Sequence, residues 1–393
     1  MSNIYPDLSI VILGHVDHGK TTLAKTLTGK WLAKHSEELK RGLTIKLGYS
    51  NFSIYKCPTH GYFTKNKCPI CGGENVFIKK ISLLDAPGHE ALLSVMLSGA
   101  AIVDAGILVI AANEPVPQPQ TLEHLLTFKF LGNKPLLVVQ NKIDLVSKEE
   151  AIKNYNKILE FLNSLGFKKN IEIIPISAIN DINIEYVLEW LVNLKTPQRD
   201  LESDPLFLVT RSFDVNKPGT PIKELRGGVL GGSLIKGKIK LNDEIEIKPG
   251  LYLNSKWKTI KTKVKNLVQG DCNVEEIRPG GTSSIETYLD PFLTKDDTLA
   301  GQIVGYPDKL PNMMEKVSLL YEKIRNTQKE LKVDEEILIV SYNISSLGKI
   351  IEKKENEITV ILKKPILANP ENKIVILAKL NNRWSLYGVG YVK

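Results

Sequence analysis

A phosphate-binding loop is the clearest chemical signal in the chain, at residues 14–21, GHVDHGKT. Glycines at the two ends of such a loop let the backbone turn until successive N–H groups point at phosphate oxygens. Lys20 would contact the β- and γ-phosphates of a nucleotide, and the Thr21 hydroxyl would bind Mg²⁺. The other expected contacts are Asp17, His18, Gly19 and Thr22, of which Asp17 is also a candidate Mg²⁺ ligand. A chance match in a glycine turn is disfavoured, because an apolar run precedes the loop and helical spacing follows it.

Two later tetrapeptides narrow the ligand to a guanine nucleotide. In DAPG (85–88), Asp85 can hold the Mg²⁺ shell, and the Gly88 N–H can approach a γ-phosphate because glycine has no Cβ. In NKID (141–144), the Asp144 carboxylate can accept from both N1–H and the 2-amino group of guanine. Adenine has neither donor and would leave a buried carboxylate unpaired, so the pocket would reject it.

Three further groups would complete the base site. Asn141 would brace the loop, the Lys142 stem would lie along the ring, and Ser177–Ala178 would offer a backbone N–H to guanine O6. Each tetrapeptide alone is weak evidence, and a lone DAPG is more often a turn. Because the motifs follow successive strands in order, together they predict GTP or GDP binding.

Hydrolysis of GTP would depend on residues close to these motifs. Thr44, in RGLTIKLGY (41–49), is a candidate second Mg²⁺ ligand, with a solvated loop threonine as the alternative. His89 follows DAPG directly, and a neutral imidazole there could hydrogen-bond a water aligned with the γ-phosphorus. A polar surface histidine is the alternative. Thr44 and Gly88 would both contact the γ-phosphate, so its loss would release both loops and make the protein a switch.

Cysteine and histidine spacing predicts a metal site. Cys57, His60, Cys68 and Cys71 form the pattern Cys-x₂-His, seven residues, Cys-x₂-Cys. Three thiolates and one imidazole suit tetrahedral Zn²⁺ in a closed structural site. A short loop has little core of its own, so the metal could supply its folding energy. Ordinary loop cysteines beside a histidine are the alternative.

Alternating lysines mark two later strands. Lys236, Lys238 and Lys240 would project from one face, and Lys261, Lys263 and Lys265 from another. Three interpretations stay open. These faces could bind phosphates, protect solvated edge strands from aggregation, or contact an acidic partner subunit.

These residues need a scaffold, and the apolar pattern supplies one. Buried strands are expected at 8–13, 81–84, 106–111, 136–139 and 171–175, alternating with helices near 90–98, 120–130, 148–165 and 183–194. Such alternation predicts a mostly parallel sheet covered by helices on both faces. After a polar linker at 195–205, short alternating runs replace the helices, with a second break at 305–311.

The predicted fold class is therefore an α/β P-loop GTPase domain followed by two β-barrel domains. The expected domains are residues 1–200, with a zinc-knuckle insertion at about 55–74, then 205–306, then 310–393. Apolar residues make up 42% and charged residues 24%, which is typical of a globular chain. No apolar run reaches the roughly 18 residues of a membrane span, and the first residues carry no apolar signal core, so we expect a cytoplasmic protein without membrane contact.

Longer segments resemble translational GTPases. HSEELKRGLTIKLGY (35–49), the stretch from DAPG to residue 115, and RSFDVNKPGT (211–220) are similar to the γ subunit of archaeal and eukaryotic translation initiation factor 2. The resemblance runs over nearly the whole chain. It implies a GTP-binding domain followed by two β-barrels. It also implies a heterotrimer with α and β subunits that delivers methionylated initiator tRNA to the small ribosomal subunit.

The resemblance assigns further roles. It implies that His89 orients the attacking water, that Val16 and Leu43 gate the approach to it, and that hydrolysis is slow without an activator. A cysteine knuckle is frequent in this family, with His60 standing here in place of a fourth cysteine.

The resemblance also places the aminoacyl end of a tRNA near Tyr49 and the turn GGVLGG (227–232). The candidate tRNA contacts are Tyr49, Gly228, Gly231 and Gly232. A barrel turn and simple packing of Tyr49 are the alternatives.

Two other functions stay open. The nearer one is an elongation-type carrier of aminoacyl-tRNA, either general or dedicated to selenocysteine. The other is an assembly scaffold that binds guanine nucleotide for stability and hydrolyses little of it. An ATPase is disfavoured by Asp144.

Overall fold

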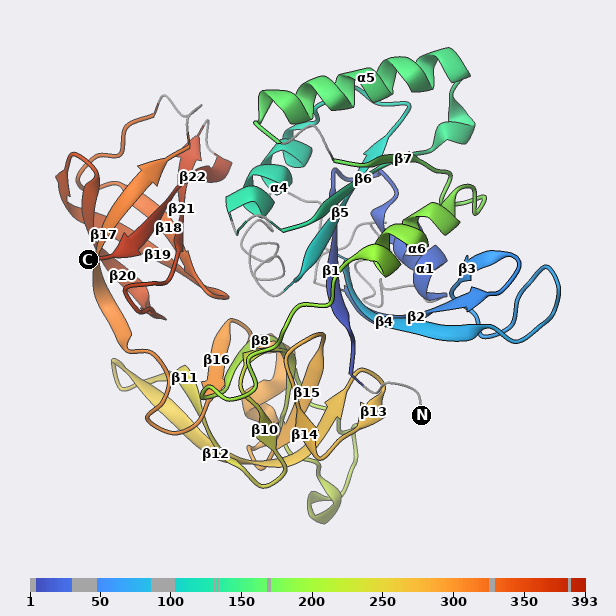
Figure 1. Ribbon diagram of the computed structural model, residues 1–393. Helices are drawn as coiled ribbons and strands as arrows, with labels where there is room; N and C mark the ends of the chain where they lie inside the picture. The colour runs from blue at the N-terminus through green and yellow to red at the C-terminus, as the bar shows by residue number, and fades with distance from the viewer. Residues whose placement is uncertain are drawn as a thin grey trace. The chain divides into compact units, whose positions relative to one another are not determined.

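The chain divides into two compact units, Met1–Gln198 and Arg199–Lys393 (Figure 1). The structure, a computed structural model, describes residues 5–29, 48–85, 103–130, 132, 134–167, 171–324, 329–380 and 383–393. The boundary between the units falls inside the polar segment 195–205.

The first unit is built on a seven-stranded sheet in the order β3-β2-β4-β1-β5-β6-β7. Its strands are β1 (Leu8–Gly14), β2 (Gly48–Cys57), β3 (Gly61–Phe63), β4 (Val76–Asp85), β5 (Ala105–Ala111), β6 (Leu136–Asn141) and β7 (Ile173–Pro175). The pairs β4–β1, β1–β5, β5–β6 and β6–β7 are parallel, whereas β2 and β3 are antiparallel additions at one edge. The carboxyl ends of the parallel strands therefore meet at one edge of the sheet, where ligands bind in open α/β folds.

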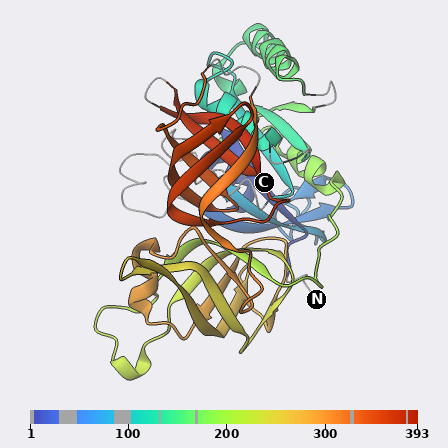
Figure 2. The same cartoon turned by 90° about the vertical axis from the view of Figure 1, so that its left-hand side faces the viewer.

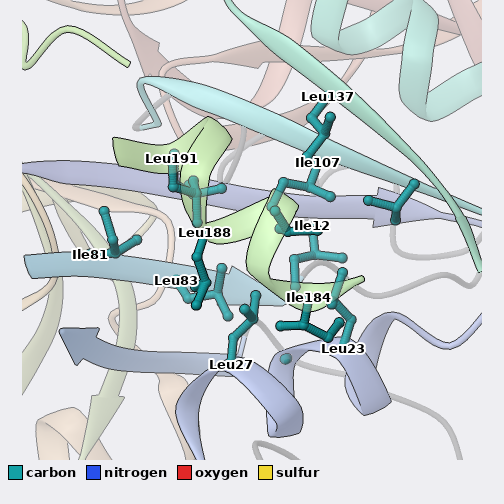
Figure 3. Packing of buried hydrophobic residues seen from close by; sticks show 14 of the residues in the cluster. Ile12, Leu23, Leu27, Ile81, Leu83, Ile107, Leu137, Ile184, Leu188 and Leu191 are labelled. Atoms are coloured by element: carbon teal, nitrogen blue, oxygen red, sulfur yellow. The ribbon is translucent and has the colours of Figure 1, made fainter. Parts of the chain in front are cut away.

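Helices cover both faces of this sheet, as Figure 1 shows. They are α1 (Lys20–Thr28), α4 (Pro119–Phe130), α5 (Lys148–Ser164) and α6 (Ile184–Asn193). α1 and α6 pack on one face, where Leu23, Leu188 and Ile107 belong to a single buried cluster (Figure 3). Every residue of β1 and β5 is buried, as expected for strands covered on both sides.

α4 packs closely against the opposite face. A Cβ at Gly106, in β5, would lie 2.8 Å from Cε2 of Phe128 in α4, a distance that real Cβ atoms do not show. Glycine at this position therefore lets α4 approach the sheet. The start of α5 is fixed differently, by a capping box in which Ser147 and Glu150 satisfy each other's backbone N–H groups.

The second unit contains two closed β-barrels. The first runs β11-β16-β8-β9-β15-β12, with β12 pairing back onto β11. Its strands are β8 (Leu206–Phe213), β9 (Val229–Lys236), β11 (Glu244–Leu253), β12 (Lys256–Gln269), β15 (Ser283–Thr287) and β16 (Gln302–Gly305). Shorter elements accompany them: β10 (Ile239–Lys240), β13 (Cys272–Asn273), β14 (Glu276–Ile277), η3 (Ile222–Glu224) and η4 (Pro291–Asp297).

The other barrel closes in the order β17-β20-β19-β18-β21-β22 (Figure 2). Its strands are β17 (Met313–Lys323), β18 (Glu336–Ser341), β19 (Ile344–Lys354), β20 (Glu357–Leu367), β21 (Ile374–Leu380) and β22 (Arg383–Val392). Closure leaves neither ring with an unpaired edge. The predicted fold class, an α/β domain with a mostly parallel sheet followed by two β-barrels, is confirmed. Within the described residues, no helix is long and apolar enough to cross a membrane.

Candidate functional site

The phosphate loop joins β1 to α1 at the carboxyl edge of the sheet, and two of its positions require glycine. Gly14 has φ 137°, and a Cβ there would lie 2.3 Å from the carbonyl oxygen of Val109. Gly19 has φ 94°, and its Cβ would lie 2.2 Å from Nδ2 of Asn141. Both the positive φ and the close approach exclude other side chains, so the loop is held against neighbouring strands.

Lys20 follows Gly19 near the end of this loop and is the first residue of α1. Its side chain is buried, and Nζ donates to the carbonyl oxygen of His15 at 2.6 Å. Burial lowers the pKa of Lys20 to about 8, while the negative charges of Asp85 and Asp17 oppose that shift. Phosphate groups beside Nζ would add negative charge and favour its protonated form.

Two predicted Mg²⁺ ligands lie side by side. Thr21, in the first turn of α1, donates its hydroxyl to Oδ2 of Asp85, at the end of β4, at 2.8 Å. Hydroxyl and carboxylate oxygens are the hard ligands that Mg²⁺ takes, so the donor set fits. Asp17 is exposed, with φ 62°.

Asn141 connects the phosphate loop to the base motifs. Its Nδ2 donates to the carbonyl oxygen of His18 at 2.9 Å, and its Oδ1 accepts from the Ala178 N–H at 3.0 Å. The Ser177 N–H donates to the carbonyl oxygen of Ile182. Both N–H groups of the Ser177–Ala178 pair thus donate within the protein, so a contact to guanine O6 requires one of them to be shared.

Asp144 lies in the short helix η2 (Ile143–Leu145). Lys142, the residue before this helix, has φ 62°. Asp144 is exposed. The expectation that the Asp144 carboxylate is buried is therefore wrong. The rejection of adenine operates only when the bound base itself covers Asp144.

The His18 side chain turns away from the loop's binding face. Its ring is buried, with Nδ1 3.1 Å from the carbonyl oxygen of Val109 and Nε2 3.2 Å from a carboxylate oxygen of Glu114. Burial lowers its pKa, against the opposing effects of the Val109 carbonyl and of Glu114. His18 can therefore offer a phosphate its backbone N–H, while its ring fixes the loop from behind.

Two residues of α4 that the sequence motifs did not predict contact the same loop. Nδ1 of His124 accepts from the Gly14 N–H, and Oε1 of Gln120 accepts from the Val16 N–H, each at 3.2 Å. Their spacing of four residues was the available signal, because it places both polar side chains on one side of a helix; both are buried.

The cysteine and histidine residues gather as the spacing predicts. The ligand atoms of Cys57, His60, Cys68 and Cys71 all lie within 4.8 Å of one another. Nδ1 of His60 is 3.5 Å from Sγ of Cys57 and 3.6 Å from Sγ of Cys68. Hydrogen bonds from Thr59, with a smaller contribution from His60, lower the pKa of Cys57 to about 5. Three thiols and one imidazole nitrogen converging this closely fit a tetrahedral Zn²⁺.

The lysines of β12 do not form an uninterrupted phosphate-binding face. Acidic partners lie within ion-pair distance of each: Lys261 of Asp308 at 3.7 Å, Lys263 of Glu244 at 3.3 Å, and Lys265 of Glu286 at 3.4 Å. Lys238, on the other stripe, lies 3.5 Å from Glu202. Interleaved acids favour the interpretation of solvated strand surfaces over that of a phosphate site.

Packing inside the barrel explains two of the three candidate tRNA glycines. A Cβ at Gly228 would lie 2.5 Å from Cγ2 of Thr294, and one at Gly232 would lie 1.9 Å from the carbonyl oxygen of Leu208. At Gly231 the nearest atom, Cε1 of Phe213, is 3.4 Å away. Packing therefore accounts for two of the three glycines. Tyr49 is partly buried and pairs with Leu84 in the β2–β4 ladder.

Three predicted catalytic residues, Thr44, Gly88 and His89, lie outside the described residues, as does Leu43.

The fold and the loop geometry define a P-loop GTPase of the translational class. Residues 6–197 match the family described as the elongation factor Tu GTP-binding domain, and residues 311–392 match the C-terminal domain of initiation factor eIF2 gamma. The chain is 45% identical to translation initiation factor 2 subunit gamma of Pyrococcus abyssi, over 98% of this chain and 97% of that protein. The corresponding subunit of Methanocaldococcus jannaschii is 44% identical, with the same coverage. The chain therefore belongs to the family of translation initiation factor 2 γ subunits, as the resemblance predicted.

Solved structures of the elongation type share the fold. A bacterial selenocysteine-specific elongation factor, EF-Sec, aligns with a TM-score of 0.75 at 25% identity, over 99% of this chain and 58% of that chain. The elongation factor SelB of Methanococcus maripaludis with a GTP analogue aligns with a TM-score of 0.74 at 23% identity, over 100% and 80%. Since identity to the initiation-factor subunits is far higher, the chain is an initiation-factor GTPase that binds GTP and GDP.

Proposed function

We propose that this chain is the core subunit of a heterotrimeric initiation factor in the cytoplasm. In its GTP-bound state it binds methionylated initiator tRNA, and with α and β subunits it delivers that tRNA to the small ribosomal subunit. GTP hydrolysis, slow until an activator acts, triggers release. One observation carries the proposal: a phosphate loop joined through Asn141 to the base motif, in a chain similar to γ subunits over nearly its full length.

The nucleotide site would work mainly by charge and position. The Lys20 ammonium would neutralise phosphate charge, and Thr21 and Asp85 would hold Mg²⁺, which would supply Lewis-acid chemistry. Asp17 and Thr44 remain candidate further ligands, and Gly88 and His89 remain the candidates for sensing the γ-phosphate and orienting water.

We further propose that Cys57, His60, Cys68 and Cys71 hold a structural Zn²⁺. His60 would ligate through Nδ1, the ring nitrogen that faces the sulfur atoms. The site closes with four protein ligands, so it would stabilise the 57–71 turn and leave no position for catalysis.

Elongation-type carriage of aminoacyl-tRNA is the second candidate, favoured by the fold shared with the selenocysteine-specific factor. The two candidates differ in the tRNA that they select. Tyr49, Gly228, Gly231 and Gly232 remain candidate contacts in both cases.

Binding of fluorescent methionyl-tRNAs to the assembled heterotrimer tests the proposal. The initiator and the elongator methionyl-tRNA carry the same amino acid, so each controls for the other. We expect tight binding of the initiator with a GTP analogue, at least tenfold weaker binding with GDP, and weak binding of the elongator in either state. Equal affinity for both tRNAs would favour the elongation-type carrier, and equal affinity in both nucleotide states would favour a scaffold.

A further inference from the structure

Helix α4 supplies two hydrogen-bond acceptors to the back of the phosphate loop. The Gly14 N–H donates to Nδ1 of His124, and the Val16 N–H donates to Oε1 of Gln120, each at 3.2 Å. The two acceptors are one helical turn apart, so they lie on the same face of α4. Both N–H groups donate to side chains of α4, so these hydrogen bonds help to fix the shape of the loop.

The His124 ring is suited to be a permanent acceptor. It is almost completely buried, and burial lowers its pKa to about 3, with smaller contributions from the positive charges of Lys20 and His15. The ring is therefore neutral at physiological pH. Because Nδ1 accepts a hydrogen bond, the ring proton resides on Nε2.

The helix that carries these acceptors is fixed in position. Phe128, one turn beyond His124, packs against Gly106 of β5 so closely that no Cβ would fit between them. Gly14 is itself buried at the end of β1. As long as the loop keeps its present conformation, the buried Gly14 N–H has no access to water. Its hydrogen bond therefore depends on the acceptor that α4 provides.

We propose that His124, supported by Gln120, is a positioning residue that holds the phosphate loop in its nucleotide-binding conformation, so that α4 controls how long a nucleotide stays bound. The proposal deepens the nucleotide site assigned above and rests on it. Without the acceptor, the binding conformation would bury an unsatisfied N–H, whereas a loop that opens could turn the same group to water. The open, nucleotide-free state would become more stable relative to the bound state, and the nucleotide would dissociate faster.

The dissociation rate of a fluorescent GDP analogue from the full chain tests this proposal. His124→Leu removes the acceptor at similar size, and we expect release to be about tenfold faster. His124→Asn restores the acceptor, because its Oδ1 can take the place of Nδ1, and its release rate should lie within about twofold of the wild type. Thr127→Val is the matched control: it is a buried residue of the same helix whose hydroxyl has no hydrogen-bond partner.

Unchanged release from His124→Leu would overturn the proposal, and so would equal acceleration by the Leu and Asn variants. Gln120→Met provides a second test should His124→Leu not fold, with several-fold faster release expected and a wild-type rate contradicting the proposal. Failure of the wild-type chain to retain GDP would instead overturn the nucleotide site itself, so the two failures are distinguishable.

Discussion

At the scale of single residues, the site depends on side chains that form hydrogen bonds to the protein backbone and so shape the place where the ligand binds. Asn141 holds the His18 carbonyl with one end and the Ala178 N–H with the other. The sequence could predict this bracing role from the NKID motif. It could not predict that the Ala178 N–H would donate to Asn141, or that the Asp144 side chain would be exposed. Both features follow from the path of the chain after β6 and β7.

Lys20 should make GDP binding sensitive to pH. Its pKa of about 8 means that the ammonium loses its proton as pH rises through 8, and phosphate favours the charged form. Between pH 7 and 8.5 we expect the dissociation constant for GDP to increase about fourfold, as the charged fraction in the free protein falls. Equilibrium titration at a series of pH values measures this.

Lys20→Met is the control for that experiment. It should bind GDP weakly, with a dissociation constant that stays level over the same pH range. A level profile in the wild type would contradict the assignment of Lys20.

At the scale of elements, the sequence predicted the bounds of a helix best where side chains next to its end fix the point at which it starts. α5 was expected at 148–165 and spans Lys148–Ser164, because Ser147 and Glu150 form the capping box that starts it. The antiparallel strands β2 and β3 were not predicted. They lie at one end of the strand order, where β2 alternates between buried and more exposed residues and β3 has no fully buried residue, so the continuous apolar run that marked β1 and β5 is absent from their sequence.

The 57–71 turn should lose its metal when one ligand is removed. Cys68 is buried among the other three ligands, so Cys68→Ser should reduce zinc from about one ion per chain to a small fraction of that. Elemental analysis of the purified proteins measures the content. Cys272→Ser, which changes the one cysteine outside the cluster, should keep the wild-type value. Equal zinc in the Cys68→Ser and wild-type proteins would refute the ligand assignment.

At the scale of the whole molecule, the order of pattern changes along the sequence predicted the architecture. Alternating strands and helices gave way to short strands at the polar segment 195–205, and the units divide at Gln198–Arg199. Which strands pair to close each barrel could not be predicted, since the closing pairs, such as β17 and β22, lie far apart in the sequence. Nor could the ion pairs of β12, which depend on acids from β11, β15 and the segment after β16.

The central claim is that guanine nucleotide controls this protein, and competition binding tests it most directly. Unlabelled GDP, ADP and xanthosine diphosphate would each displace fluorescent GDP from the wild type and from Asp144→Asn. We predict that the wild type prefers GDP over ADP by roughly 1,000-fold or more, because the bound guanine covers Asp144 and pairs with it. Asp144→Asn should bind GDP much more weakly than the wild type does. It should bind xanthosine diphosphate better than GDP, because the 2-oxo group of xanthine can accept a hydrogen bond from the side-chain amide N–H. Wild-type GDP affinity and preference in Asp144→Asn would contradict the account.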